Sequence, residues 1–130
     1  MNAPLSEQAL QTLKAASLED KYTVPVRRVL RSGGQALVRL PLLQRARDEQ
    51  AGLKTAGFIS GYRGSPLGNY DQALQKAKRH LDAQNVVFQP GVNEELAATA
   101  IWGTQQLAFA PKAEQLHDGV FGIWYGKGPG

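Results

Sequence analysis

Two adjacent acids, Glu94 and Glu95, are the residues of this chain best placed for acid–base chemistry. They stand near the front of residues 91–103, GVNEELAATAIWG, a stretch that is otherwise mostly apolar. Its pattern predicts a helix that begins after Asn93, a residue type favoured at the N-cap. Acids in the first turn of a helix compensate the positive end of its dipole, so a purely structural role accounts for both residues at this point.

Glu94 is singled out by the helical face that it occupies. It shares this face with Ala97, Ala98 and Ile101, which are small or apolar. A carboxylate that enters an apolar environment costs free energy unless a partner meets it. The spacing therefore makes Glu94 a candidate functional acid.

Further polar groups fall in segments rich in glycine and proline. Residues 62–68, YRGSPLG, place Ser65 between Gly64 and Pro66. The backbone of this loop could approach a small anion, and its composition equally suits an ordinary turn. Residues 126–130, GKGPG, lack the spacing, the Ser or Thr and the following helix of a phosphate-binding loop.

Composition excludes several classes of function. A chain of 130 residues, 42% hydrophobic and 20% charged, is typical of one soluble domain. The net charge of +4 comes from scattered basic residues, so we expect no nucleic-acid surface. The absence of cysteine excludes disulfides and cysteine-held metal or iron–sulfur sites within this chain. No apolar run reaches the length of a membrane span and no signal-peptide pattern is present, so we expect a cytoplasmic protein without a membrane partner. His80 and His117 show no triad or metal-site spacing, and we expect both at the surface.

Short apolar runs alternate along the chain with segments of helical spacing. We expect strands at residues 55–62, 85–90 and 119–126, helices at residues 35–52, 70–82 and 93–109, a short surface helix at residues 6–16 and an edge strand at residues 24–30. This alternation predicts an α/β fold with a parallel sheet and right-handed crossovers. Ligands of such folds bind beyond the carboxyl ends of the strands, where we expect residues 61–69, 89–95 and 124–130.

The first two long helices also carry predictions about their core faces. In the helix at residues 35–52 we expect Ala36, Leu37, Leu40 and Leu43 on one side and Arg39, Arg45 and Arg47 elsewhere. Pro41 should kink this helix and Gly52 should end it. In the helix at residues 70–82 the expected N-cap is Asn69 and the expected core positions are Tyr70, Ala73, Leu74, Ala77 and Leu81.

Four stretches resemble the N-terminal part of the fused bacterial indolepyruvate ferredoxin oxidoreductases. They are SLEDKYT at residues 17–23, the run from GGQALVRLP to NYDQAL at residues 33–74, VVFQPGVNEELAATAIWGTQQ at residues 86–106, and DGVFGIWYGKGPG at residues 118–130. These enzymes are thiamine-diphosphate-dependent 2-oxoacid:ferredoxin oxidoreductases. The resemblance implies an N-terminal extension at residues 1–24 and a pyrimidine-binding (PYR) type α/β domain at residues 25–130, incomplete at its C-terminal end.

The resemblance also implies roles for individual residues. The family's VNE glutamate matches Glu94, which would be the catalytic residue, while Glu95 would face solvent. A carboxyl group bound to the aminopyrimidine ring of the cofactor favours the imino tautomer that generates the reactive ylid. The loop YRGSPL matches a family loop beside the substrate carboxylate, with Arg63 where the family often has proline. The implied cofactor-binding residues are Glu94, Tyr62 and Gly64, and the implied substrate-binding residues are Ser65, Arg63 and Lys127.

The implied reaction is the oxidative decarboxylation of aryl pyruvates such as indolepyruvate, with coenzyme A and ferredoxin as partners and acyl-CoA, carbon dioxide and reduced ferredoxin as products. Mg²⁺ and 4Fe-4S clusters would be bound elsewhere in the enzyme, because this chain has no Gly-Asp-Gly motif and no cysteine. We expect the chain alone to be inactive and the complete enzyme to be a homo-oligomer with its remaining domains. The alternative is a non-catalytic α/β binding or interaction module that associates through an exposed sheet edge.

Overall fold

The computed structural model describes residues 6–8, 11, 15–23, 29–64 and 67–127. Its centre is a sheet of three parallel strands in the order β2-β1-β3, with β1 at Thr55–Gly61, β2 at Val86–Phe88 and β3 at Gly119–Tyr125. The predicted α/β class and its parallel sheet are therefore confirmed. Much of the expected helix at residues 6–16 and of the expected edge strand at residues 24–30 lies outside the described residues, as does the expected domain boundary at residues 24 and 25.

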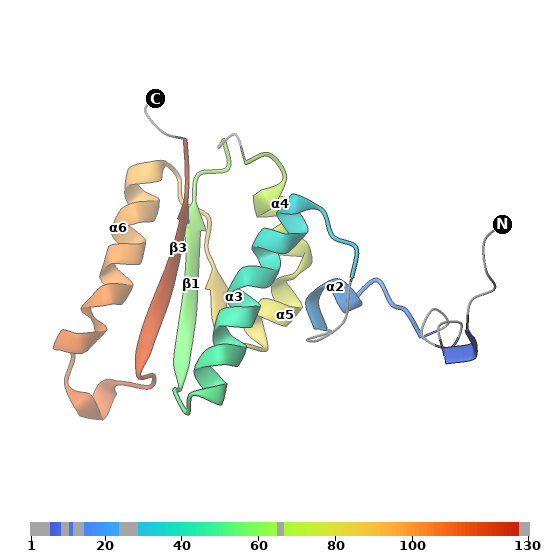
Figure 1. Cartoon of the computed structure of the whole chain (residues 1–130). Helices are drawn as coiled ribbons and strands as arrows, with labels where there is room; N and C mark the ends of the chain where they lie inside the picture. The colour runs from blue at the N-terminus through green and yellow to red at the C-terminus, as the bar shows by residue number, and fades with distance from the viewer. Residues whose placement is uncertain (1–5, 9–10, 12–14, 24–28, 65–66, 128–130) are drawn as a thin grey trace.

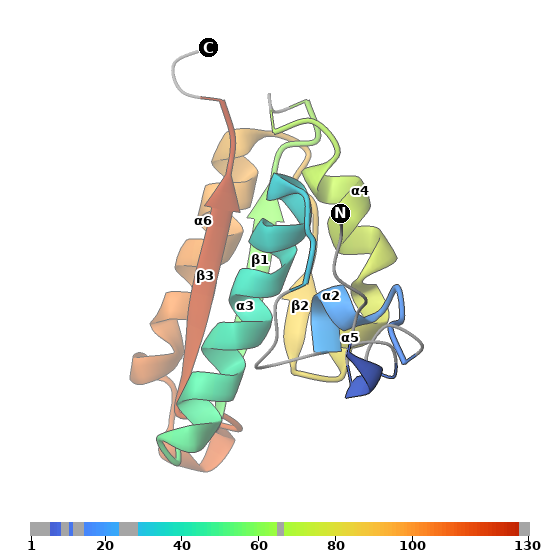
Figure 2. The same ribbon diagram turned by 45° about the vertical axis from the view of Figure 1, so that its right-hand side comes forward.

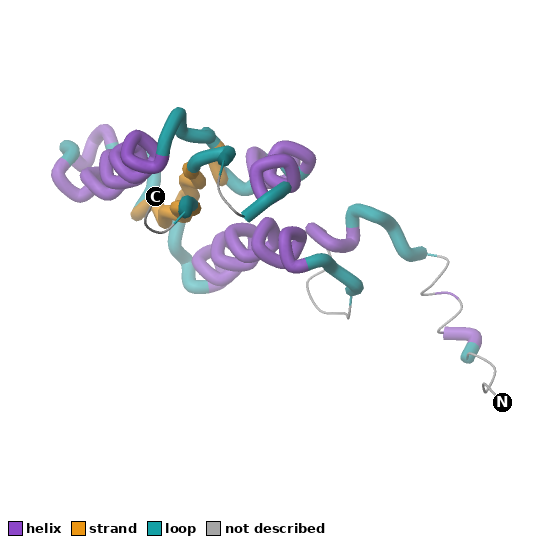
Figure 3. Tube along the Cα trace, turned by 90° about the horizontal axis from the view of Figure 1, so that it is seen from above, coloured by secondary structure: helices purple, strands orange, loops and turns teal. Residues whose placement is uncertain are grey.

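Helices cover both faces of the sheet (Figures 1 and 2). One face is covered by α3 (Gly33–Gln50), α4 (Tyr70–Lys76) and α5 (Lys78–Asp82), and the other by α6 (Glu94–Thr104). The short helix α2 (Asp20–Thr23) packs against α3, and the 3-10 turns η1 (Gln105–Phe109) and η2 (Lys112–Glu114) lead from α6 to β3. Seen from above, the sheet lies between these two helical layers (Figure 3). Within the described part of the chain, no helix combines the length and apolarity needed to cross a membrane.

The connections between the strands define where a ligand would be expected. The chain passes from β1 to β2 through α4 and α5 on one face, and from β2 back across β1 to β3 through α6 on the other face. The two crossovers therefore lie on opposite faces of the sheet. In doubly wound sheets of this order, ligands bind where the first and third strands meet, outside their carboxyl ends.

The core lies mainly between the sheet and the α3, α4 and α5 layer. Tyr22 from α2 also belongs to it, so a residue of the expected N-terminal extension packs with the domain. In the 70–82 segment, Tyr70, Leu74, Ala77 and Leu81 are buried and Ala73 packs against them, as the sequence pattern predicts. The segment is divided at Ala77 into α4 and α5.

Asn69 does not cap α4 in the predicted way. Its backbone φ is 71° and its side chain makes no capping hydrogen bond. This left-handed conformation is one that asparagine tolerates better than most residues, so Asn69 serves as a turn residue. Asn93, in contrast, has the predicted role, because its side chain accepts a 2.8 Å hydrogen bond from the Leu96 backbone nitrogen. The helix that follows ends at Thr104 and continues as η1, shorter than the predicted span to residue 109.

The predicted core face of α3 is wrong. Its buried residues are Val38, Arg39, Pro41, Leu42 and Arg45, whereas Leu37, Leu40 and Leu43 are 38%, 55% and 37% exposed. The helix begins with a capping box formed by Ser32 and Gln35 and runs without interruption past Pro41 to Gln50.

Polar partners explain why an arginine, Arg45, can occupy a buried position on α3. Arg45 Nε donates to the Gln84 backbone oxygen at 3.0 Å, and Arg45 Nη1 donates to Thr55 Oγ1 at 3.0 Å. Burying a charged group is tolerated when its donors are satisfied, and the aliphatic stem of arginine packs as apolar surface. Leucines occur on several sides of α3, so their spacing alone could not indicate which side meets the sheet.

Candidate functional site

Three loops meet at the carboxyl edge of the sheet, at the top of Figure 1. Tyr62, directly after β1, forms a parallel bridge with Gly91, two residues before the α6 N-cap Asn93. The Gly91 nitrogen donates to the Gly61 oxygen at 2.9 Å, and the Tyr62 nitrogen donates to the Tyr125 oxygen at 3.3 Å. These backbone hydrogen bonds bring the three loops that the sequence singled out to one place, next to the junction of β1 and β3.

Glu94 lies at the first turn of α6, against the end of β3. A side-chain carbon at position 126, which is glycine, would lie 2.6 Å from the Trp124 ring and 2.9 Å from Glu94 Cγ, so both side chains pack beside Gly126. The Trp124 indole Nε1 donates to the Glu94 backbone oxygen at 3.2 Å. Glu94 is half-buried, whereas Glu95 is exposed. Glu94 is thus less exposed than Glu95, as its helical face in the sequence predicts.

A shallow hollow of about 340 Å³ lies beside these acids and is lined by Asn93, Glu94, Glu95 and Lys127. It combines the amino-terminal end of α6, two carboxylates and one exposed ammonium group. Such a set can accept hydrogen bonds from protonated ring nitrogens or amino groups through the carboxylates, and can attract an anionic group through Lys127. This hollow is the place where the expected catalytic residue and one expected substrate-binding residue come together.

Tyr62 and Gly64 are close neighbours in the loop after β1. A side-chain carbon on Gly64 would lie 2.4 Å from Tyr62 Cε1, so the tyrosine ring rests directly on the glycine. The ring remains 37% exposed. It therefore offers a flat apolar surface at the edge of the sheet, on which an aromatic ligand could stack.

Arg63 points toward the opposite helical layer. Its Nε donates to Asp71 Oδ2 of α4 at 3.1 Å, while the arginine side chain stays 66% exposed. The structure thus brings Arg63 to an ion pair and does not bring it to the hollow beside Glu94. Ser65, the other expected substrate-binding residue of this loop, lies outside the described residues.

Two buried hydroxyl groups near this edge were not found by sequence reasoning. Ser60 Oγ and Tyr125 Oη are buried and have no hydrogen-bond partner within the described part of the chain. Burial raises the pKa of the Tyr125 phenol, and the neighbouring Asp71 carboxylate raises it further, while Arg63 opposes this. Burial also raises the pKa of Tyr70, whose ring stands edge-on to Tyr125 at 5.1 Å, to about 12. Both phenols are therefore neutral hydrogen-bonding groups at neutral pH. In the sequence, only the position of Tyr125 in a predicted strand and of Tyr70 in a predicted helix could have indicated their burial.

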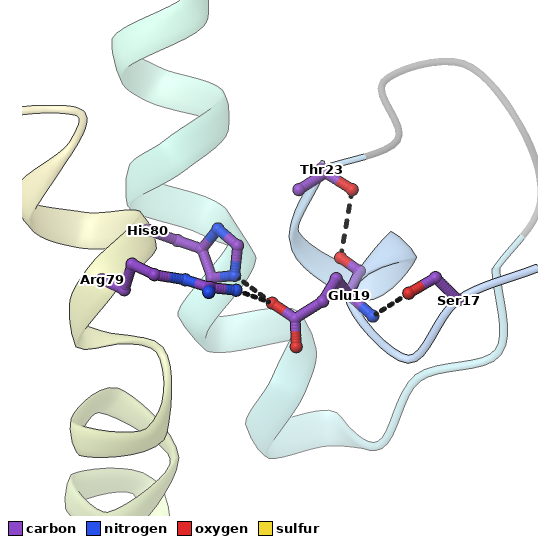
Figure 4. Close-up of polar contacts among 5 residues, drawn as sticks. All are labelled: Ser17, Glu19, Thr23, Arg79 and His80. Atoms are coloured by element: carbon purple, nitrogen blue, oxygen red, sulfur yellow. Dashed lines mark hydrogen bonds and ion pairs between the residues drawn. The ribbon is translucent and has the colours of Figure 1, made fainter.

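A second polar cluster joins α2 to α5, away from the carboxyl edge (Figure 4). Glu19 Oε2 accepts hydrogen bonds from His80 Nε2 and, at 2.9 Å, from Arg79 Nη2. The His80 ring also packs against Tyr22 with 5.0 Å between centroids, and its side chain is only 17% exposed. The prediction of a surface His80 is wrong, because the N-terminal segment folds over it and supplies both a carboxylate and an aromatic ring.

The Glu19 cluster predicts a loss of stability in acid. The hydrogen bond from His80 lowers the pKa of Glu19 below its ordinary value of 4.5. Desolvation raises this pKa in part, and the hydrogen bond from Arg79 lowers it further. A carboxylate with a lowered folded-state pKa stabilises the fold above its unfolded pKa, and this contribution disappears as the pH falls through the folded-state value. Glu19→Gln should therefore be less stable than wild type at neutral pH and equally stable in acid, as measured by urea unfolding between about pH 7 and pH 3. Glu114→Gln serves as the exposed control, and a gap between Glu19→Gln and wild type that is independent of pH would contradict this assignment.

A larger hollow, of about 720 Å³, lies between α2, the start of α3 and α4. It is wide, and its rim carries charges of both signs, including Glu19, Lys21 and Lys76. Volume alone therefore does not make it the better candidate, and the smaller hollow beside Glu94 is preferred because a half-buried carboxylate borders it at the strand junction.

The groups around Glu94 are chemically compatible with the pyrimidine half of thiamine diphosphate. The half-buried Glu94 borders an open hollow at the start of α6. The described residues contain no group of three or more metal-binding side chains, and the expectation that Mg²⁺ and the clusters bind elsewhere stays a prediction. Comparison with family models, with curated proteins and with solved structures gives no match to this chain.

Proposed function

We propose that this chain supplies the pyrimidine-binding half of a thiamine-diphosphate site in an oxidoreductase that decarboxylates aryl pyruvates such as indolepyruvate. Coenzyme A and ferredoxin would be the further partners, and the remaining enzyme domains would hold Mg²⁺ and the 4Fe-4S clusters. The observation that carries this proposal is the position of Glu94. It is a half-buried carboxylate on an apolar helix, set against glycine at the junction of β1 and β3.

Within this proposal each residue of the chain has a limited task. When bound, thiamine diphosphate supplies the nucleophilic carbon that attacks a 2-oxoacid. Glu94 holds or accepts a proton at the aminopyrimidine ring, and the Trp124 indole, which donates to the Glu94 backbone oxygen, ties the first turn of α6 to β3. Tyr62 provides a flat surface beside the ring. The absence of a side chain at Gly64 leaves room for the Tyr62 ring to pack against the backbone there. Lys127, which lines the hollow, attracts the negative charge of the substrate, whereas Arg63 is paired with Asp71 and does not line the hollow.

The two tryptophans of the chain allow a direct test by NMR. The Trp124 indole N–H is bonded to the Glu94 backbone, whereas Trp102 is 64% exposed on the outer side of α6. Adding millimolar thiamine diphosphate and Mg²⁺ should shift the Trp124 indole signal and leave that of Trp102 unchanged. Glu94→Gln should remove the shift and Glu95→Gln should preserve it, because only the Glu94 carboxylate binds the ring.

Two results would contradict the proposal. One is an unchanged Trp124 signal, or a shift that survives Glu94→Gln. The other is tight binding of the cofactor by the chain alone in calorimetry, because the pyrophosphate and metal half of the site is proposed to lie in other domains. The alternative, a non-catalytic interaction module, is favoured by the exposed apolar side of α6, and it predicts no response of either tryptophan to the cofactor.

A further inference from the structure

A buried hydroxyl without a partner lies at the end of β3, against α4. Tyr125 is 4% exposed, and its Oη makes no hydrogen bond within the described part of the chain. Leaving a buried polar atom unpaired costs free energy, so such an atom in a folded protein requires an explanation. The ring stands edge-on to Tyr70 at 5.1 Å and packs directly on Gly61. The hydroxyl is therefore fixed in position, and any partner has to come to it.

An ion pair lies beside this hydroxyl. Arg63 Nε donates to Asp71 Oδ2 at 3.1 Å. Burial raises the pKa of the Tyr125 phenol, Asp71 raises it further and Arg63 lowers it, so both members of the pair act on this phenol. Chain connections bring the three groups together: Asp71 follows Tyr70, and Arg63 follows Tyr62, whose nitrogen donates to the Tyr125 oxygen at 3.3 Å.

The two members of the pair differ in exposure. The Arg63 side chain is 66% exposed, whereas that of Asp71 is only 13% exposed. Arg63 can therefore turn toward an anion in solution, and its guanidinium fork suits a carboxylate. Asp71 would then remain as a largely buried carboxylate without its partner, which is costly unless another donor replaces Arg63. The Tyr125 hydroxyl is a donor that is already in place.

We propose that Asp71 exchanges partners: when Arg63 leaves to bind the carboxylate of a 2-oxoacid, the Asp71 carboxylate turns and accepts a hydrogen bond from Tyr125 Oη. Tyr125 is thus a positioning residue, which holds Asp71 in place of Arg63 and does not touch the ligand. The new hydrogen bond has a charged acceptor, so it offsets much of the cost of freeing Arg63. The identity of the ligand rests on the function proposed above, whereas the exchange itself depends only on residues of this chain.

The first test needs no ligand and uses a double-mutant cycle in the full 130-residue chain, measured by urea unfolding. Arg63→Gln mimics the departure of the exposed partner. In the wild-type chain, Tyr125→Phe removes a hydroxyl without a partner and should raise the unfolding constant by less than about threefold. In the Arg63→Gln chain the same hydroxyl holds Asp71, so Tyr125→Phe should raise the unfolding constant at least about tenfold.

Ser60→Ala is the matched control for this cycle, because it removes the other buried hydroxyl that has no partner among the described residues. Its effect should be small and the same with and without Arg63→Gln. If Tyr125→Phe has equal effects in the two backgrounds, or if Ser60→Ala shows the same coupling to Arg63→Gln, the exchange is refuted.

The second test adds phenylpyruvate to the same chain. At millimolar concentration it should shift the NMR signal of the Arg63 Nε–H and slow the solvent exchange of the Tyr125 hydroxyl proton. Its methyl ester, which lacks the carboxylate charge, should do neither. Tyr125→Phe should weaken phenylpyruvate binding at least about fivefold, because Asp71 then holds Arg63 back, and Ser60→Ala should not change it.

An Arg63 signal that does not respond to phenylpyruvate, or that responds equally to the ester, overturns the proposed carboxylate ligand. Binding that is unaffected by Tyr125→Phe overturns the positioning role of Tyr125. Failure of the proposed function is read separately, from the response of Trp124 to thiamine diphosphate, and the ligand-free cycle is independent of that result.

Discussion

Glu94→Gln is expected, under the function proposed above, to lower the rate of indolepyruvate decarboxylation about 10²- to 10⁴-fold in the assembled enzyme, the range typical of a lost acid–base group. Glutamine has nearly the same shape as glutamate but cannot exchange a proton at this position. The backbone oxygen that accepts the Trp124 hydrogen bond is retained, so the start of α6 should be undisturbed. The measurement is single-turnover decarboxylation together with isotope exchange of the reactive cofactor proton.

Glu95→Gln is the matched control for this prediction. The two positions are adjacent and the substitution is identical, so any effect of the lost first-turn charge on helix stability should be similar in both variants. Glu95 is exposed, and its replacement should change the decarboxylation rate less than about threefold, a difference below ~1 kcal/mol in the barrier. Similar losses in the two variants would overturn the assignment of Glu94 as the proton-exchanging residue.

Gly61→Ala is expected to destabilise the fold by about 3 kcal/mol, at the upper end for overpacking a core. A side-chain carbon at position 61 would lie 2.3 Å from the Tyr125 backbone oxygen and 2.4 Å from Tyr125 Cδ1. The first of these atoms is main chain in the adjacent strand, so β1 and β3 would have to separate where the three loops meet. The measurement is the free energy of unfolding in urea.

Gly68→Ala provides the comparison for Gly61→Ala. Its added carbon would meet no atom within 4 Å, and the position lies in an exposed turn. We expect a change of less than about 0.5 kcal/mol at this site. Similar unfolding midpoints for the two variants would show that the close approach of β1 and β3 is not needed for stability.

Local patterns were sufficient to predict most of the elements. The three strands, the α/β class and the N-cap at Asn93 depend on neighbouring residues and on short-range spacing, and the structure has all of them. The carboxyl-edge location of the three loops also followed from the sequence, because the carboxyl ends of parallel strands lie at one edge of a sheet. The roles of Glu94, Lys127 and the loop at residues 62–65 come from the family resemblance and remain predictions.

Features that depend on contacts between distant segments could not be predicted in this way. Arg45 is buried because Gln84 and Thr55, far from it along the chain, satisfy its donors. His80 leaves the surface because Glu19 reaches it from the N-terminal segment. In both cases residue type indicated exposure, and tertiary hydrogen bonds removed the cost of burial.

The sequence by itself determined the strands, the helices and the presence of two neighbouring acids at the start of α6, because these follow from local spacing and capping. Only the tertiary structure decided which acid is half-buried and what surrounds it, since this depends on β3 and the Trp124 side chain arriving beside the start of α6. It also decided that the outer side of α6 is left bare, because one three-stranded sheet offers that helix a single face on which to pack.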